Sequence, residues 1–395
     1  MRKRSNKPMT LILALIILTI GWVIRAEALE PRVLWKKEFK ASINTQLAKE
    51  SGDVVIDNGI PDIILIDKSG NTRFAWGPRV DRNAYFPNIS DNGNVITFTS
   101  SWKKEYVLKM KKRTLDERVH YVQRNGKELW SKPYPPMAYL ELDYSGFYKA
   151  YLSPDGKYIA IVGHFDIQGG GKDIELWDSA GKKLWRFTLY GVQEFLFSPD
   201  SKYLVAGLGG GAVIVLDLLG NITFKDDFAV ATGLSSITIS KNADYIGTSG
   251  VHRTAIIDKQ GNILLDGGKS ENNMSFVNKE GTRGVLWDGN RVDIYNMPNK
   301  ALLKTYNIGL IRDGMHKRKM DMSSDGRYMA LTGKKTSSAS PSNIFVIDLV
   351  EDKIWETQLI GFDYITISMS TTGQYLLIET SVVGKKSAIY YYQIY

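Results

Sequence analysis

Side chains that could carry out catalysis or bind a metal are scarce in this chain. Its 395 residues contain no cysteine, which excludes disulfides, thiolate metal sites and cysteine nucleophiles. The four histidines lie too far apart in the sequence to form a metal-binding pair, and no serine-hydrolase, zinc-protease or calcium-loop motif occurs. We therefore predict no catalytic residue, no metal site and no cofactor.

The residues whose grouping indicates a binding function are lysines and arginines in sequence insertions. Segment 100–121 is the richest, and smaller groups follow in 333–343 and near residue 385. Clustered basic side chains attract acidic proteins, anionic lipid headgroups or acidic polymers and speed the encounter. The alternative is a solvated hairpin whose charges only keep it soluble. The candidate partner-binding residues are Lys103, Lys104, Lys109, Lys111, Lys112, Arg113, Arg118, Lys334, Lys335, Lys385 and Lys386.

Five aspartates open a turn pattern that recurs along the chain. In the copy 177–181, Asp178 is followed by a glycine three residues later and then by a large apolar residue, Trp185. An aspartate can accept hydrogen bonds from N–H groups of a turn, and glycine tolerates positive φ. In the degenerate copy 295–299, the large residue is expected to be Leu303. We predict structural turn roles for Asp67, Asp178, Asp217, Asp258 and Asp348.

These turns belong to a repeat of about 40–45 residues, which is the length of a propeller blade. A second turn precedes each of them: the sequence of 151–158 recurs at 197–203 and 322–328. Two hairpins per repeat make a four-stranded blade. We predict an all-β fold with a single β-propeller of eight blades. Seven blades is the alternative, because the first repeat, 43–78, is degenerate.

The two ends of the repeat region complement each other. The last repeat stops after its third strand, at 390–395, while segment 33–39 resembles the fourth strand 183–189. We expect the N-terminal strand to complete the last blade, so that residues 33–395 form one closed domain without open sheet edges. The main insertions all fall between the second and third strands of their blades. We therefore expect them on one face of the ring.

The N-terminus has the three parts of an export signal. Basic residues in 2–7 precede an apolar run, 9–24, and then the small-residue site Ala26-Glu27-Ala28. We predict that residues 1–28 are a signal peptide or, alternatively, an uncleaved membrane anchor. Either way, the propeller would lie outside the cytoplasm: periplasmic, secreted or anchored facing outward. Export disfavours nucleic acid as a partner. Nearly half of the net charge of +9 belongs to this segment.

The repeat resembles two groups of propellers. The Asp-x-x-Gly-x-x-x-Trp pattern is similar to the repeat of PQQ-like quinoprotein propellers, and the Ser-Pro-Asp-Gly-Lys-Tyr turn of 153–158 to WD40-like and TolB-like propellers. Quinoprotein dehydrogenases would imply a quinone and a calcium ion, but this chain lacks their vicinal cysteines and a recognisable carboxylate–asparagine set. Non-catalytic propellers of this architecture are scaffolds.

The combined features predict a binding protein. We expect a monomeric, non-catalytic, extracytoplasmic scaffold that binds a protein or an anionic envelope component through the basic insertions. The alternative is a ligand- or cofactor-binding enzyme of the quinoprotein type.

Overall fold

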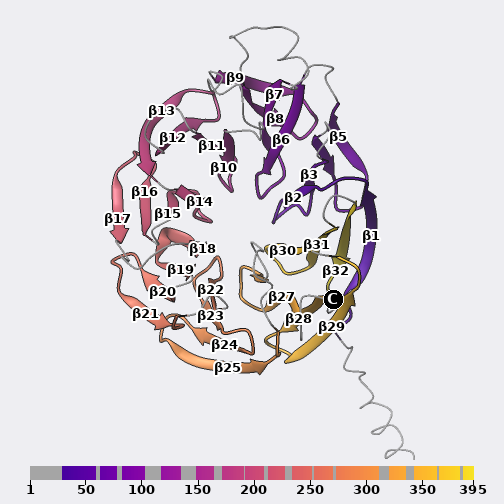
Figure 1. Ribbon diagram of the computed structural model, residues 1–395, viewed down its shortest axis with the longest axis vertical. Helices are drawn as coiled ribbons and strands as arrows, with labels where there is room; N and C mark the ends of the chain where they lie inside the picture. Colours follow the sequence, from indigo (N-terminus) through magenta and orange to yellow (C-terminus); the bar gives the residue numbers. More distant parts are fainter. Residues whose placement is uncertain are drawn as a thin grey trace, which may run out of the picture.

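The protein is a closed ring of β-sheets around a central channel (Figure 1). The computed structural model describes residues 29–58, 63–77, 82–102, 117–134, 148–163, 171–190, 192–208, 212–226, 234–250, 253–269, 273–310, 320–334, 342–362, 364–382 and 386–395. These residues form eight four-stranded antiparallel sheets and one short 3₁₀ helix, Lys241–Ala243. The predicted all-β fold and the count of eight blades are confirmed.

Blades 1 to 4 follow the order of the chain. Blade 1 contains β2 (Asn44–Leu47), β3 (Val54–Asp57), β4 (Ile63–Ile66) and β5 (Thr72–Trp76). Blade 2 contains β6 (Arg82–Ile89), β7 (Val95–Trp102), β8 (Glu117–Gln123) and β9 (Glu128–Tyr134). Blade 3 contains β10 (Lys149–Leu152), β11 (Tyr158–Gly163), β12 (Gly171–Asp178) and β13 (Lys183–Tyr190). Blade 4 contains β14 (Val192–Phe197), β15 (Tyr203–Leu208), β16 (Val213–Asp217) and β17 (Ile222–Asp226).

Blades 5 to 8 complete the ring. Blade 5 contains β18 (Leu234–Ile239), β19 (Tyr245–Gly250), β20 (Thr254–Asp258) and β21 (Ile263–Asp266). Blade 6 contains β22 (Met274–Val277), β23 (Arg283–Trp287), β24 (Arg291–Asn296) and β25 (Ala301–Asn307). Blade 7 contains β26 (Met320–Met322), β27 (Tyr328–Lys334), β28 (Ser342–Asp348) and β29 (Lys353–Leu359). Blade 8 combines β30 (Tyr364–Met369), β31 (Tyr375–Val382) and β32 (Lys386–Gln393) with β1 (Arg32–Phe39).

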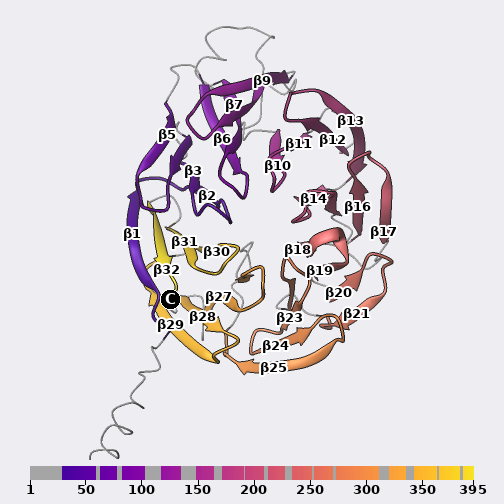
Figure 2. The same ribbon diagram turned by 180° about the vertical axis from the view of Figure 1, so that it is seen from behind.

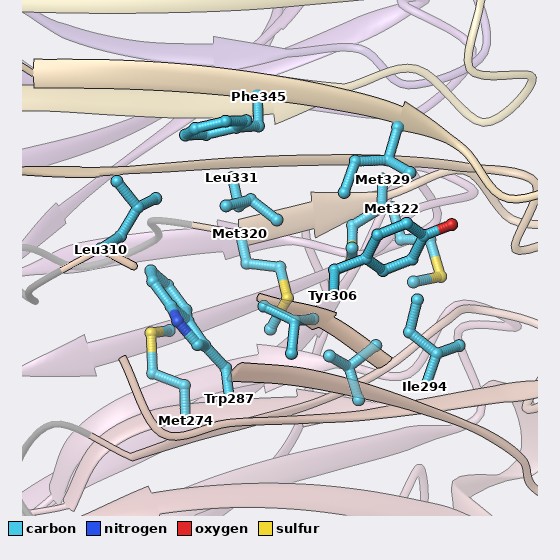
Figure 3. Close-up of a cluster of buried hydrophobic side chains, with 13 residues drawn as sticks. Met274, Trp287, Ile294, Tyr306, Leu310, Met320, Met322, Met329, Leu331 and Phe345 are labelled. Atoms are coloured by element: carbon cyan, nitrogen blue, oxygen red, sulfur yellow. The ribbon is translucent and has the colours of Figure 1, made fainter. Parts of the chain in front are cut away.

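Strand composition follows position within the blade. In blade 7, β28 is buried along its whole length, whereas the outermost strand, β29, alternates between half-buried and exposed residues. This pattern arises because inner strands are covered by sheets on both sides, while the outermost strand has one side in water. Between blades 6 and 7, for example, Met274, Trp287, Met320 and Phe345 belong to one continuous buried cluster (Figure 3).

The ring is closed by the first strand of the chain, as the sequence predicts. β1 pairs with β32 in antiparallel register, and the two strands lie side by side next to the C-terminus (Figure 1). The Trp35 ring stacks on Tyr391, with centroids 4.9 Å apart. Its indole N–H also donates to the Lys68 carbonyl of blade 1, at 3.1 Å. β1 therefore completes the sheet of blade 8 and also connects that blade to blade 1.

Aromatic side chains on the outermost strands act as wedges between blades. The indole N–H groups of Trp130 and Trp185 donate to Ser179 O, at 3.0 Å, and Leu218 O, at 2.8 Å, in the turn of the following blade. Each ring lies against that turn's glycine: a Cβ on Gly220 (φ 85°) would lie 3.2 Å from the Trp185 ring. The recurring glycine thus serves both the turn dihedral and the approach of the wedge.

Strand polarity gives the ring two different faces. The turns from first to second strand in all eight blades, and from third to fourth strand in blades 1 to 7, lie on one side, the turn face. The longer connections lie on the other side, the loop face. On the turn face, backbone hydrogen bonds link neighbouring blades, including Asp91 N–H to Pro154 O (2.8 Å), Ser324 N–H to Thr371 O (2.8 Å) and Thr371 N–H to Lys49 O (2.7 Å). The turns therefore form a belt that ties adjacent blades together.

Candidate functional site

The innermost strands of all eight blades line a channel of about 530 Å³. The ring around it is seen from both sides in Figures 1 and 2. Its wall combines the aromatic residues Phe86, Tyr151 and Phe276 with polar and charged side chains. A cavity of this size and mixed character is a candidate binding site, so its charged groups decide what chemistry it offers.

The carboxylates of the channel bind backbone groups of the next blade. Asp321 Oδ2 accepts from Met369 N–H at 2.9 Å, and Glu194 Oε2 accepts from Ile237 N–H at 2.7 Å. Innermost strands are sheet edges, and their outward N–H groups require acceptors when they are buried in a seam. These side chains therefore join consecutive blades.

Two lysines of the turn face form ion pairs with channel carboxylates of non-adjacent blades. Lys49 Nζ, in blade 1, lies 2.9 Å from Asp321 Oδ2, in blade 7. Lys279, in blade 6, pairs with Asp91 in blade 2, on the opposite side of an eight-bladed ring. Both pairs are largely buried, so neither is a freely solvated surface pair.

The channel carboxylates do not fit the calcium site that a quinoprotein resemblance implies. Asp91 and Asp321 each bind a lysine, while Glu194 binds a backbone N–H group. Within the part of the chain that the structure describes, no group of three or more histidine or acidic side chains is placed to hold a metal ion. We derive no reaction step through a quinone.

Glu379 is the channel carboxyl with the most perturbed protonation. Its Oε2 accepts from both the N–H (3.1 Å) and the hydroxyl (2.6 Å) of Thr45, in the adjoining blade 1. Burial raises the pKa of Glu379 to about 7, although the hydrogen bonds from Thr45 act in the opposite direction. The seam that closes the ring thus contains a carboxyl group that titrates near neutrality.

Blade 2 contains a hydrogen-bonded row of a serine, a histidine and a carboxylate that the sequence pattern does not indicate. Ser100 Oγ lies 2.8 Å from His120 Nε2, and His120 Nδ1 lies 2.7 Å from Glu128 Oε2. These residues come from the adjacent strands β7, β8 and β9, so only the pairing brings them together. Ser100 is fully buried and the His120 ring stacks on Phe98, which suits a polar link within the blade rather than an accessible nucleophile.

The turn aspartates bind backbone N–H groups of their own turns. Asp67 Oδ1 accepts from the N–H groups of residues 69 and 71, both at 2.9 Å. The same arrangement recurs at Asp178, Asp217 and Asp258. Asp348 accepts from two N–H groups of its turn and also from the Arg327 guanidinium. Burial raises the pKa of Asp67, but backbone hydrogen bonds outweigh it, and the pKa is below its usual value.

Three of the candidate basic residues lie in the described part of the chain, all at loop-face ends of strands. Arg118 is the second residue of β8 and donates to Ser131 Oγ at 3.0 Å. Lys334 ends β27 and is buried, with 7% of its surface exposed, whereas Lys386 begins β32 and is exposed. Outside the described residues lie Lys103, Lys104, Lys109, Lys111, Lys112, Arg113, Lys335 and Lys385, together with residues 1–28.

Among the described residues, no helix has the length and apolar character needed to cross a bilayer.

Comparison with known proteins identifies the fold. No family model matches the sequence, and no curated protein matches it. The crystal structure of the C-terminal WD40 domain of Sif2 is similar, with a TM-score of 0.62, 12% sequence identity, and coverage of 92% of this chain and 98% of that chain. A likeness at this identity concerns the fold alone. The protein has the fold of a WD40-like β-propeller, and the quinoprotein part of the resemblance is not confirmed.

Proposed function

We propose that this protein is a non-catalytic, extracytoplasmic scaffold that binds a protein or an anionic envelope component through basic insertions on its loop face. The observation that carries this proposal is the position of Arg118, Lys334 and Lys386 at loop-face strand ends. Their blades, 2, 7 and 8, are separated only by blade 1. The insertions that contain the other candidate basic residues join the same strands.

The contrast between the two faces supports the choice of the loop face. Turn-face connections are short and use their polar groups within the belt, as the bond between Lys241 N–H and Lys279 O (2.7 Å) illustrates. Binding surfaces on propellers and other rigid scaffolds are typically built from longer connections that the scaffold presents. A basic sector on such a face would attract an anionic partner and orient it during encounter.

The test compares equal charge losses on the two faces. Glutamine replacements at Lys109, Lys111, Lys112 and Arg113 should weaken sedimentation with phosphatidylglycerol vesicles and recovery of envelope proteins by more than tenfold, because each basic residue contributes about 1 kcal/mol near an anionic surface. The matched control carries glutamine at Lys157, Lys182, Lys202 and Lys241, which lie exposed on the turn face.

The outcome separates specific binding from general basicity. The control should bind like the wild type, and equal losses in both variants would contradict the proposal.

The mass of the mature protein, together with its recovery in membrane or soluble fractions, tests export and distinguishes cleavage after Ala28 from a retained anchor.

A further inference from the structure

The seam between blades 6 and 7 lacks the large apolar wedge of the other seams, which is an aromatic ring in six blades and Leu265 in blade 5. In β25 the register pairs Lys304 with Ile294, the ladder position at which Trp185 pairs with Leu176 in blade 3. The turn before β25 is one residue longer than the equivalent turn of blade 3, so the wedge position is Lys304, whereas the sequence spacing predicts Leu303. A lysine therefore occupies the place where several other blades insert a ring.

Lys304 forms an ion pair at the surface instead of filling the seam. Its partner is Asp352 in the turn of blade 7, which also accepts from the Tyr306 hydroxyl at 3.0 Å. Both charged side chains are substantially exposed. A groove of about 360 Å³ lies beside Lys304 at this seam.

The groove has a mixed lining, in which apolar side chains stand beside the charged residues Arg283, Lys304, Asp325 and Arg327. The Asp325 carboxylate accepts from the Ser323 hydroxyl and the Arg327 N–H of its own turn. Ile294, which belongs to the buried cluster shown in Figure 3, contributes from blade 6, and Leu349 contributes from blade 7. Leu303 and Val350 lie at its rim with 48% and 69% of their surfaces exposed. Exposed apolar side chains on both sides of one groove are typical of a surface that receives an apolar group from a partner.

A cationic group also reaches the groove. Arg283 lies in the first hairpin of blade 6, where its carbonyl accepts from Asn278 N–H. In five other blades, the residue whose carbonyl accepts the equivalent turn hydrogen bond is a tyrosine. The Arg283 stem packs under Gly326, and its guanidinium donates to Thr282 O at 3.1 Å. No carboxylate of the described residues is placed to form an ion pair with it, whereas the other two cations of the groove, Lys304 and Arg327, are paired with Asp352 and Asp348.

We propose that this groove binds an aromatic side chain of a partner protein that carries a carboxylate next to the ring. The ring takes the place of the missing wedge between Leu303 and Leu349. An indole N–H would donate to Leu349 O, which corresponds to the acceptors Ser179 O and Leu218 O in other seams. The adjacent carboxylate pairs with Arg283. This site lies on the turn face and is independent of the function proposed for the loop face.

The first experiment uses the full chain and the peptide acetyl-Asp-Trp-Glu-amide. Methyl NMR of leucine and valine should show saturable shifts at Leu303, Leu349 and Val350. Replacing tryptophan in the peptide by alanine should weaken binding at least tenfold. Replacing the acids by Asn and Gln should weaken it several-fold, because a charge-assisted hydrogen bond is lost. Unchanged binding in either peptide would overturn the corresponding half of the proposal.

Two variants connect binding to the groove. Lys304→Trp restores the wedge and should abolish the peptide-induced shifts, while the remaining methyl spectrum reports that the variant is folded. Arg283→Tyr should retain binding that depends on tryptophan but lose the preference for the acidic peptide. Leu265→Trp, at the same ladder position in blade 5, is the matched control and should bind normally. Wild-type affinity in Lys304→Trp would overturn the site.

Discussion

At the seam between blades 3 and 4, Trp185 lies against Gly220 and donates to Leu218 O. At the seam between blades 6 and 7, Lys304 stands at the same ladder position and pairs with Asp352. The first seam is filled by an apolar ring with a satisfied N–H, and the second is crossed by an exposed ion pair above a groove. The same fold therefore tolerates loss of a wedge at one seam. We expect the Trp185 contact to contribute more to the free energy of unfolding than the Lys304–Asp352 ion pair does.

The largest effect is expected at the filled seam. Trp185→Ala removes the ring and its hydrogen bond and leaves a cavity, so the free energy of unfolding should fall by about 3 kcal/mol. Denaturant titration followed by tryptophan fluorescence and circular dichroism measures this change. A loss below about 1 kcal/mol would show that the wedge fills space without stabilising the ring.

An intermediate effect, dependent on pH, is expected at the seam that closes the ring. The pKa of Glu379 is raised to about 7 when folded, above its unfolded value. A raised carboxyl pKa means that the folded state holds the proton more tightly, so this stabilisation is present at low pH and is lost as pH rises through about 7. Glu379→Gln should raise stability at pH 8 by on the order of 2 kcal/mol relative to wild type.

The control for this prediction is the pH profile itself. Gln can still accept from Thr45 through its amide oxygen, so wild type and variant should converge below the unfolded pKa of the carboxyl. Thermal unfolding between pH 4 and pH 8 measures the two curves. Parallel curves across that range would contradict the assignment to Glu379.

The smallest effect is expected at the open seam. Lys304→Ala removes an exposed ion pair, and such pairs contribute about 0–1 kcal/mol. The unfolding free energy should therefore change by less than about 1 kcal/mol, as measured by the same titration used for Trp185. A loss equal to that of Trp185→Ala would erase the distinction between the two seams.

The fold could be predicted from the sequence because its information is local and repeated. Turn glycines such as Gly156 and Gly181 have positive φ, and each marks a hairpin whose position along the chain counts the blades. The closing strand could be predicted because segment 33–39 resembles other fourth strands. These signals depend on residues a few positions apart.

The channel and the seams could not be predicted in the same way. The pair Lys279–Asp91 depends on the diameter of the ring, and the row from Ser100 to Glu128 depends on the pairing of three strands. One extra residue in the turn between β24 and β25 moves the wedge position from Leu303 to Lys304, and only the strand pairing shows where that residue is accommodated. The basic insertions remain a prediction from composition, because most of their residues lie outside the described part of the chain.

The pairing of β1 with β32 also has a consequence for the order of folding. The closing sheet joins the N-terminal and the C-terminal strands of the propeller, which are synthesised furthest apart in time. Contacts between such distant segments form slowly because the intervening chain must first be ordered. The blades can assemble in sequence as they emerge, but the ring cannot close until the C-terminal residues arrive. Until then, β1 has no strand partner, and one face of blade 1 and one of the latest blade stay open to other chains, so this is the stage at which a chaperone would be most useful.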